Sequence, residues 1–284
     1  MLILVTGLCG FTGRYVQSEL EANGHSVIGL SCDLTDQKAV ADEVSRVQPE
    51  AVIHLAGVAF VGHKDANAFY EVNLIGTYNL LAALAQHAPN VRSVLLVSSA
   101  NVYGNRSEGI LNENIIPDPA NDYAVSKLAM ENMARLWQDK LPLFIVRPFN
   151  YSGIGQENKF IIPKIVSHFR ERKGVIELGN LDISRDFSDV RTVAKVYQKL
   201  IEICPAGQTI NVCSGNSYSL REVIALCAKI TNYQIEVKVN PDFVRPNEVR
   251  VLMGDNNLLM QLIDNWQLFS LEETLNWMLT DNSI

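Results

Sequence analysis

Short apolar runs alternate with helix-length amphipathic segments along the first half of the chain. The apolar runs lie at residues 2–7, 26–30, 51–57, 93–99 and 143–150, and the helical segments lie at about 14–23, up to 47, 66–87 and 123–140. Strands that are apolar throughout are buried on both faces, and helical connections between such strands are typical of a parallel sheet. The pattern predicts an α/β fold with a doubly wound parallel sheet.

The alternation becomes less regular after residue 150. Helical patterns at about 161–172, 190–203 and from 220 onward are mixed with short strand-like runs, a proline-bearing loop and a C-terminal helical piece. We therefore predict a Rossmann cofactor domain at 1–150, with 185–213 returning to it, and a smaller C-terminal α/β substrate lobe at 151–284. No internal repeat or flexible linker is visible.

The charge balance restricts the kind of partner. The chain of 284 residues has a formal net charge of −7, which argues against nucleic acid or an anionic membrane surface as the main partner. Its five cysteines form no close pair and no metal-like cluster with the histidines, so we expect reduced thiols, no bound metal and a cytoplasmic protein. No stretch is long enough to span a bilayer.

A glycine-rich turn directly follows the first apolar run. Gly7, Gly10 and Gly13 stand between the predicted strand and the first helix, where backbone amides and a helix N-terminus can hold a pyrophosphate. A plain tight turn is the alternative interpretation. If the turn binds a dinucleotide, we expect further contacts from these residues: Phe11, Thr12, Leu55, Ala56 and Gly57.

The end of the second strand bears on the choice of cofactor. Ser31 stands where an acidic residue would hold the ribose 2′-hydroxyl of NAD, and Arg14 could meet a 2′-phosphate, although an exposed arginine without a ligand is an equal alternative. Asp33 and Leu34 are placed to flank the adenine, and Asp33 could equally cap the next helix. These residues favour NADP(H), with NAD(H) as the alternative.

Three polar residues form a candidate catalytic set. Tyr123 and Lys127 lie one turn apart on a predicted helix, so the ammonium can lie near the phenol and lower its pKa. Ser99, at the end of the preceding strand, would hydrogen-bond the reacting oxygen and align it with the tyrosine. His54 is interpreted as a satisfied core residue at the end of a buried strand.

These motifs together resemble the extended short-chain dehydrogenase/reductase family of nucleotide-sugar enzymes. The similarity runs nearly end to end, through "TGLCGFTG", "VIHLAG", "VNLIGTYNLL", "VSSANVYG", "YAVSK", "VRPFNYSGIGQ", "RDFSDV" and "RPNE". The resemblance implies that Ser99, Tyr123 and Lys127 form the catalytic triad and that the protein is a homodimer. It also implies contacts to the sugar nucleotide from Asn150, Arg185, Arg245 and Glu248. Asn180 is a candidate base or ribose contact, with a loop asparagine in a turn as the alternative.

Within that family the segment "LGNLDISRDF" is most similar to the GDP-mannose branch, which includes 4,6-dehydratases and GDP-4-keto-6-deoxymannose reductases. The dehydratases carry acidic residues after the catalytic serine or threonine, whereas this chain has Ala100 and Asn101. We therefore expect NAD(P)H-dependent reduction of the C4 ketone of a GDP-4-keto-6-deoxyhexose, giving a product of the GDP-rhamnose or GDP-6-deoxytalose type. A nucleotide-sugar 4-epimerase and a catalytically silent NAD(P)-binding regulator are the alternatives.

Overall fold

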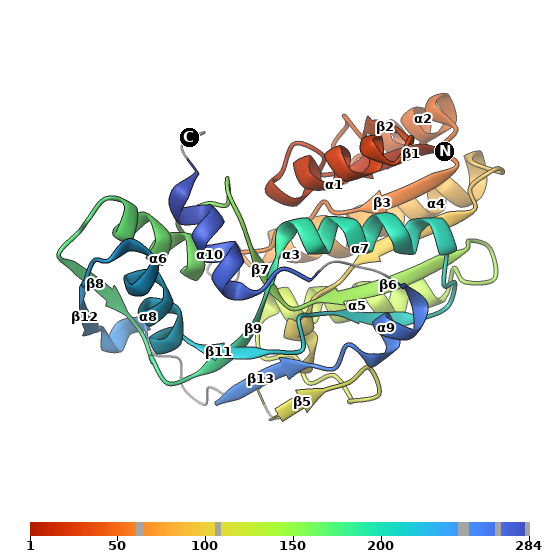
Figure 1. Cartoon of the computed structure of the whole chain (residues 1–284). Coiled ribbons are helices and arrows are strands. Elements are labelled where there is room, and N and C mark those ends of the chain that lie inside the picture. Colours follow the sequence, from red (N-terminus) through yellow and green to blue (C-terminus); the bar gives the residue numbers. More distant parts are fainter. Residues whose placement is uncertain (61–64, 106–108, 244–249, 265–267, 282–284) are drawn as a thin grey trace.

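The computed structural model describes residues 1–60, 65–105, 109–243, 250–264 and 268–281. A six-stranded parallel sheet occupies one side of the molecule, and a smaller lobe adjoins it (Figure 1). In spatial order the strands are β10 (Thr209–Val212), β6 (Leu143–Pro148), β4 (Ser93–Val97), β3 (Ala51–His54), β1 (Leu2–Thr6) and β2 (Ser26–Gly29). The predicted doubly wound parallel sheet is confirmed.

Helices cover both faces of this sheet because successive side chains of each strand point to opposite faces. Ile3 and Val5 of β1 belong to the core beneath α1 and α7, whereas Leu4 belongs to the opposite core beneath α2 and α4. The helices on the two faces are α1 (Phe11–Ala22), α7 (Val190–Ile203), α2 (Gln37–Val47), α4 (Thr77–His87) and α5 (Asp122–Arg135). Apolar residues throughout each strand therefore fill two separate cores.

Two expected helices differ in detail. The segment expected at 66–87 consists of α3 (Asn67–Tyr70), the π-helix η1 (Glu71–Gly76) and α4. A π-helical turn is uncommon and often occurs at functional sites. The helix expected to reach residue 140 ends at Arg135, where the chain continues in turns closed by bonds such as that from the Trp137 amide to the Ala134 carbonyl, 2.9 Å.

A second sheet joins the two parts of the molecule. Its strands are β11 (Ser217–Ser219), β9 (Ser184–Asp189), β13 (Val251–Gly254) and β5 (Gly109–Leu111), and β7 (Asn150–Ser152) also pairs with β9. The sequence pattern did not predict β5, β9 or β13, because β5 and β13 are short and β9, although six residues long, is largely polar. Through the pairing of β7 with β9, the chain leaving β6 is held at the edge of the smaller lobe.

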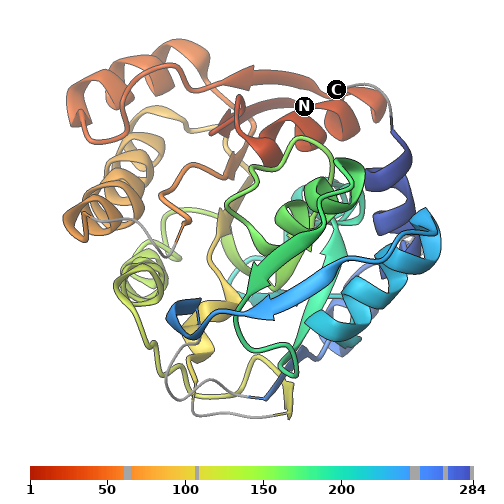
Figure 2. The ribbon, with the colours of Figure 1, turned by 90° about the vertical axis from the view of Figure 1, so that its left-hand side faces the viewer.

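The smaller lobe has its own apolar core. Figure 2 shows the helices and strands of this lobe facing the viewer. The two-stranded sheet of β8 (Val175–Leu178) and β12 (Glu236–Val239) packs beside three helices, α6 (Ile161–Arg170), α8 (Leu220–Thr231) and α10 (Leu271–Thr280). The remaining short elements are η2 (Ala100–Tyr103), η3 (Pro241–Phe243) and α9 (Asn257–Leu262). Among the residues described, no helix is both long and apolar enough to cross a membrane.

Candidate functional site

A cavity of about 670 Å³ lies at the carboxyl edge of the parallel sheet, between it and the smaller lobe. The loops that follow β1, β3, β4 and β6 all contribute to its wall, because the carboxyl ends of parallel strands meet at one edge. It brings together these residues singled out from the sequence: Gly7, Gly10, Phe11, Thr12, Gly13, Leu55, Ala56, Gly57, Ser99, Tyr123, Lys127 and Asn150.

The glycine turn has the shape of a phosphate cradle. A β-carbon on Gly7, whose φ is 71°, would lie 2.9 Å from the Ala56 amide nitrogen, and a β-carbon on Gly13 would overlap the carbonyl oxygens of Leu8 and Gly7. Gly10 caps α1 without a side-chain hydrogen bond, and the first turn of that helix carries no acidic residue. The first-turn amides and the positive end of the helix are therefore available to a dinucleotide diphosphate. The turn fits such a cofactor.

Ser99, Tyr123 and Lys127 are brought together by the end of β4 and the first turns of α5. Asn121 caps this helix by accepting a 2.9 Å hydrogen bond from the Ala124 amide, which places Tyr123 and Lys127 on the face turned toward Ser99. The three residues are 6%, 7% and 5% exposed, respectively. The Lys127 ammonium donates a 2.8 Å hydrogen bond to the Val97 carbonyl, directly before the serines.

Burial controls the ionisation of this set. It raises the pKa of Tyr123 to about 12, although a hydrogen bond from Ser99 acts in the opposite direction. Burial also lowers the pKa of Lys127 to about 8, and the nearby Glu131 carboxylate opposes that change. In the free protein, burial therefore outweighs the lowering of the tyrosine pKa that the sequence led us to expect from the lysine.

A buried ion pair lies behind the catalytic set. Glu131, one turn beyond Lys127 on α5, accepts two hydrogen bonds from the Arg147 guanidinium at 2.9 and 2.6 Å and one from the Ser98 hydroxyl at 2.6 Å. Burial opposes the charge on Arg147, but Glu131 outweighs it and raises the pKa of the guanidinium. Both partners are almost fully buried, so the pair fixes α5 to β4 and β6 beneath the site.

Asn73, a buried residue beside the cavity residue Gly57, had no role assigned from the sequence. It lies in the π-helix η1, where its side-chain oxygen accepts a 2.9 Å bond from the Val58 amide and its amide group donates to the Ser126 hydroxyl at 3.0 Å. A β-carbon on Gly57 would lie 2.7 Å from this side-chain oxygen and 3.3 Å from the Lys127 nitrogen. The motif "VNLIGTYNLL" contained Asn73, but only the fold shows that it lies beside the lysine.

His54 is a core residue, as the sequence indicated. One ring nitrogen lies 2.7 Å from the Thr6 hydroxyl and the other 2.8 Å from the Thr77 hydroxyl. Burial, with a smaller effect from the charge on Lys127, lowers the pKa of this histidine to about 3. A neutral ring that both threonines contact stabilises the junction of β1, β3 and α4.

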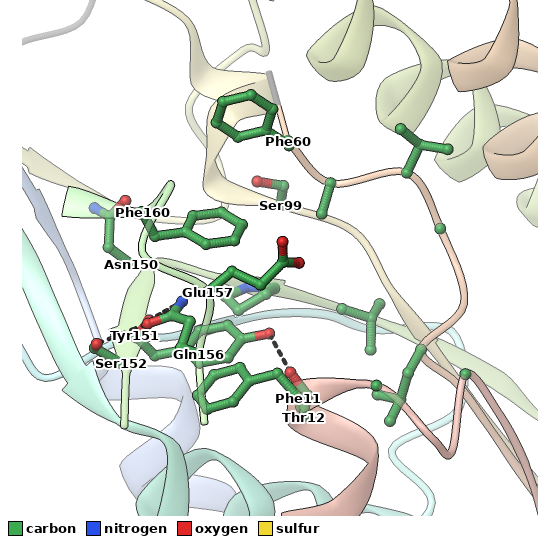
Figure 3. Close-up of a pocket in the computed structure, with 18 of the residues that line it drawn as sticks. Phe11, Thr12, Phe60, Ser99, Asn150, Tyr151, Ser152, Gln156, Glu157 and Phe160 are labelled. Atoms are coloured by element: carbon green, nitrogen blue, oxygen red, sulfur yellow. Dashed lines mark hydrogen bonds between the residues drawn. The ribbon is translucent and has the colours of Figure 1, made fainter. Parts of the chain in front are cut away.

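The smaller lobe supplies a second wall that sequence reasoning missed (Figure 3). The hydroxyls of Tyr151 and Thr12 lie 2.9 Å apart, so β7 is tied to the glycine turn. Phe60 and Phe160 meet edge to face with ring centroids 5.9 Å apart, and the Lys159 ammonium lies 5.3 and 5.7 Å from their respective centroids. Lys159 therefore places a cation at this wall of the cavity.

The adenosine side of the proposed cofactor site differs from the expectation. The Ser31 hydroxyl donates to the Glu43 carboxylate at 2.9 Å, and the Ser31 and Cys32 amides donate to the same group at 3.0 and 3.1 Å. Burial opposes ionisation of Glu43, but these hydrogen bonds keep its pKa below the usual value. Position 31 itself carries no acid, as the sequence shows, but helix α2 places the Glu43 carboxylate beside it.

Among the neighbouring residues, the alternative that Asp33 caps α2 was wrong, and the cofactor contacts stay predictions. Arg14 extends to the Gly155 carbonyl at 3.4 Å, and Asp33 accepts bonds from Thr35 and does not cap α2. Asp36 is the capping residue of that helix, through a 3.0 Å bond from the Ala39 amide. Leu34 is buried, and its β-carbon lies 2.9 Å from the position that a β-carbon on Gly76 would occupy. Arg14, Ser31, Asp33 and Leu34 are not among the described residues that line the cavity.

The expected substrate residues divide into three groups. Asn150 lines the cavity and donates a 3.2 Å bond to the Asp186 carbonyl. Asn180, whose side chain accepts a bond from the Asp182 amide, and Arg185, which donates to the Ser184 carbonyl, are not among the described lining residues. Arg245 and Glu248 lie outside the part of the chain that the structure describes.

Comparison with known proteins identifies the family. A family model described as the NAD dependent epimerase/dehydratase family matches residues 3–213. The chain belongs to this family. One relative that resembles it over nearly the whole length is "GDP-6-deoxy-D-talose 4-dehydrogenase" of Aggregatibacter actinomycetemcomitans, which is 35% identical to this chain. The alignment covers 93% of this chain and 92% of the relative.

A second family member, "GDP-6-deoxy-D-mannose reductase" of Pseudomonas aeruginosa, is 36% identical, with 89% of this chain and 88% of the relative covered. The solved structure of RMD from Pseudomonas aeruginosa complexed with NADPH superposes with a TM-score of 0.90 at 33% identity, covering 98% and 97% of the two chains, respectively. This epimerase/dehydratase family member is therefore an extended short-chain dehydrogenase/reductase and an NAD(P)-dependent oxidoreductase.

Proposed function

We propose that the protein reduces the C4 ketone of a GDP-4-keto-6-deoxyhexose with NAD(P)H and releases a GDP-6-deoxyhexose. The observation that carries the proposal is the composition of the cavity, which combines a buried phenol, a serine hydroxyl and a lysine beside the glycine cradle. Two relatives of 35% and 36% identity that bear the names of enzymes for GDP-linked deoxyhexoses support the substrate class.

The roles of the side chains follow from their ionisation. The reduced nicotinamide, when bound, supplies the hydride to C4. Because burial raises its pKa to about 12, Tyr123 is protonated at neutral pH and can deliver a proton to the C4 oxygen as the alkoxide forms. Ser99 orients that oxygen, and Lys127 stabilises the phenolate that remains on Tyr123.

The side chains that line the cavity also disfavour a dehydration. Elimination of water from a hexose needs an acid or base for the C5 proton and the C6 hydroxyl, and Ala100 and Asn101 supply neither. Among the described residues that line the cavity, Glu157 is the one carboxylate, and it is paired with the Lys159 ammonium at 2.9 Å. The hydroxyl, phenol and lysine suffice for transfer of a hydride and a proton.

For the nucleotide we propose contacts from both parts of the molecule. Asn150 is placed at the cavity wall, and Arg185 and Arg245 are proposed to approach the diphosphate, with Asn180 and Glu248 toward the nucleoside or sugar. Lys159 is a further cation among the described lining residues, and a bound diphosphate would compete with Glu157, 2.9 Å away, for its ammonium. The acidic chain thereby gains local positive charge where an anionic substrate binds.

We also propose an organisation for the whole chain. Residues 1–150 together with 185–213 would form the cofactor domain, and the rest of 151–284 would form the substrate lobe. The exposed apolar side chains of Ile75, Tyr78 and Leu136, which are 49%, 43% and 79% exposed, are proposed to pack against a second copy of the chain in a homodimer. The five cysteines are all free, which supports a reducing, cytoplasmic location.

The test is oxidation of NADPH and of NADH by the purified protein with GDP-4-keto-6-deoxymannose, followed by cofactor absorbance. We expect stoichiometric cofactor consumption and a 6-deoxyhexose product, with dTDP-4-keto-6-deoxyglucose as a comparison that is reduced more slowly. Conversion of a GDP-6-deoxyhexose to its C4 epimer without net cofactor consumption would refute the proposal. Formation of a 4-keto-6-deoxy sugar from GDP-mannose would refute it as well.

A further inference from the structure

Asn101 makes an unusual double contact with the proposed catalytic serine. Ser99 is the N-cap of the short helix η2, so its hydroxyl oxygen accepts a hydrogen bond from the Asn101 backbone amide at 3.1 Å. The Asn101 side-chain amide donates a second bond to the same oxygen, also at 3.1 Å. Any residue at 101 other than proline supplies the first bond, but the second depends on the asparagine side chain.

Counting donors and acceptors determines where the serine proton points. A hydroxyl has one hydrogen to donate and two acceptor positions. Since both acceptor positions of Ser99 are filled by Asn101, the hydrogen must point away from that residue. Ser99 and Tyr123 line the same cavity, and the serine lowers the pKa of the Tyr123 phenol against the larger opposite effect of burial, so this phenol is the acceptor to which we assign the remaining hydrogen.

We infer that Asn101 is a positioning residue, whose side-chain amide orients the Ser99 hydroxyl so that its one hydrogen is donated to Tyr123 in the free protein and to the C4 oxygen when a ketone is bound. The donation to the C4 oxygen rests on the proposed function, whereas the donation to Tyr123 does not depend on it. Asn101 is exposed and lines the cavity, so its amide reaches this position from the substrate side.

The chemistry also explains why an amide suits this place in a reductase. A carboxylate at position 101 would accept the serine proton and turn the Ser99 hydrogen bond away from Tyr123. A protonated carboxyl could donate as the amide does. The ionisable residues that line the cavity with Asn101 are Cys9, Tyr123, Lys127, Tyr151, Glu157 and Lys159. Burial raises the pKa of both tyrosines, so their phenols are neutral at ordinary pH.

Two variants separate this role from a structural one. We expect Asn101→Ala to lower kcat by about tenfold with little change in KM, the loss typical of one hydrogen bond acting in the transition state. Asn101→Asp should lose about 100-fold at neutral pH and recover activity as the pH falls and its carboxyl becomes protonated. Equal losses with parallel pH profiles in the two variants would overturn the inference, as would unchanged kcat.

A measurement without substrate tests the hydrogen bond from Ser99 to Tyr123 independently of the proposed function. Tyrosine labelled with ¹³C at Cζ can be observed by NMR in the complex with oxidised cofactor, with Tyr123→Phe to identify the Tyr123 signal. The ionisation of Tyr123 should move to higher pH in Asn101→Ala and further in Asn101→Asp. Asn112→Ala, which removes a bond to the Asn114 amide outside the cavity, is the matched control and should cause no change. An unshifted Tyr123 ionisation in both Asn101 variants would overturn the inference even if the protein reduces the ketone.

Discussion

Lys127 offers a quantitative test of how this site is built, because a buried ammonium destabilises the protein that carries it. Burial lowers its pKa from 10.5 to about 8. At 1.36 kcal/mol per pKa unit, a shift of about 2.5 units corresponds to about 3 kcal/mol of stability that the free protein lacks below pH 8. We expect Lys127→Met, which keeps the length of the side chain without the charge, to remove this cost.

The effect has a defined direction with pH. Between pH 8 and pH 10.5 the unfolded chain still binds a proton that the folded Lys127 has released, so the stability of the unmodified protein rises across that window. The variant lacks this rise. From pH 7 to pH 10 the unmodified protein should therefore gain about 2.5 kcal/mol relative to Lys127→Met. Loss of the hydrogen bond to Val97 does not alter this difference, because neutral and charged lysine can both donate it.

The assay is urea unfolding of both proteins at several pH values from 7 to 10, without cofactor and followed by circular dichroism. His54 does not interfere, because its pKa of about 3 leaves it neutral throughout. Lys229→Met is the control, since that ammonium is 70% exposed and pairs with Glu272 on the surface. Parallel stability curves for the unmodified protein and Lys127→Met would refute the reasoning, and Lys127 would then be charged in the folded protein throughout this range.

Three further substitutions test other parts of the structure. Tyr123→Phe should lower turnover by at least about 100-fold because the proton donor is lost, while cofactor affinity measured by fluorescence titration changes little. Gly104→Ala should cost at least about 3 kcal/mol in thermal unfolding, because φ is 69° and the new β-carbon would overlap the Asp118 carbonyl oxygen. Arg147→Met should cost about 3 to 5 kcal/mol by removing the buried partner of Glu131 and leaving it only the more exposed Arg135 at 3.8 Å, and replacing Glu131 with Leu as well should recover part of that loss in the same urea assay.

The sequence by itself determined the parallel sheet and one end of the candidate site. Apolar runs such as 94–97 predict buried strands because strands covered on both faces are apolar nearly throughout. The glycine turn after β1 and the four-residue spacing of Tyr123 and Lys127 are local features, so the strand, turn and helix that carry them suffice to place them. Those residues do line one cavity, while their chemical roles stay predictions.

Only the tertiary structure decided the contacts between segments that are distant in the sequence. Ser31 donates a hydrogen bond to the carboxylate of Glu43, which is twelve residues away on a helix that packs back over the strand end. The residue type at position 31 does not predict this contact. Phe60 and Phe160 meet because β7 pairs with β9 and brings the following loop over the sheet edge. Such pairings depend on how whole elements pack, and the same short polar strands could pair in several ways. The wall that the smaller lobe contributes to the cavity is therefore a property of the fold and not of any local sequence pattern.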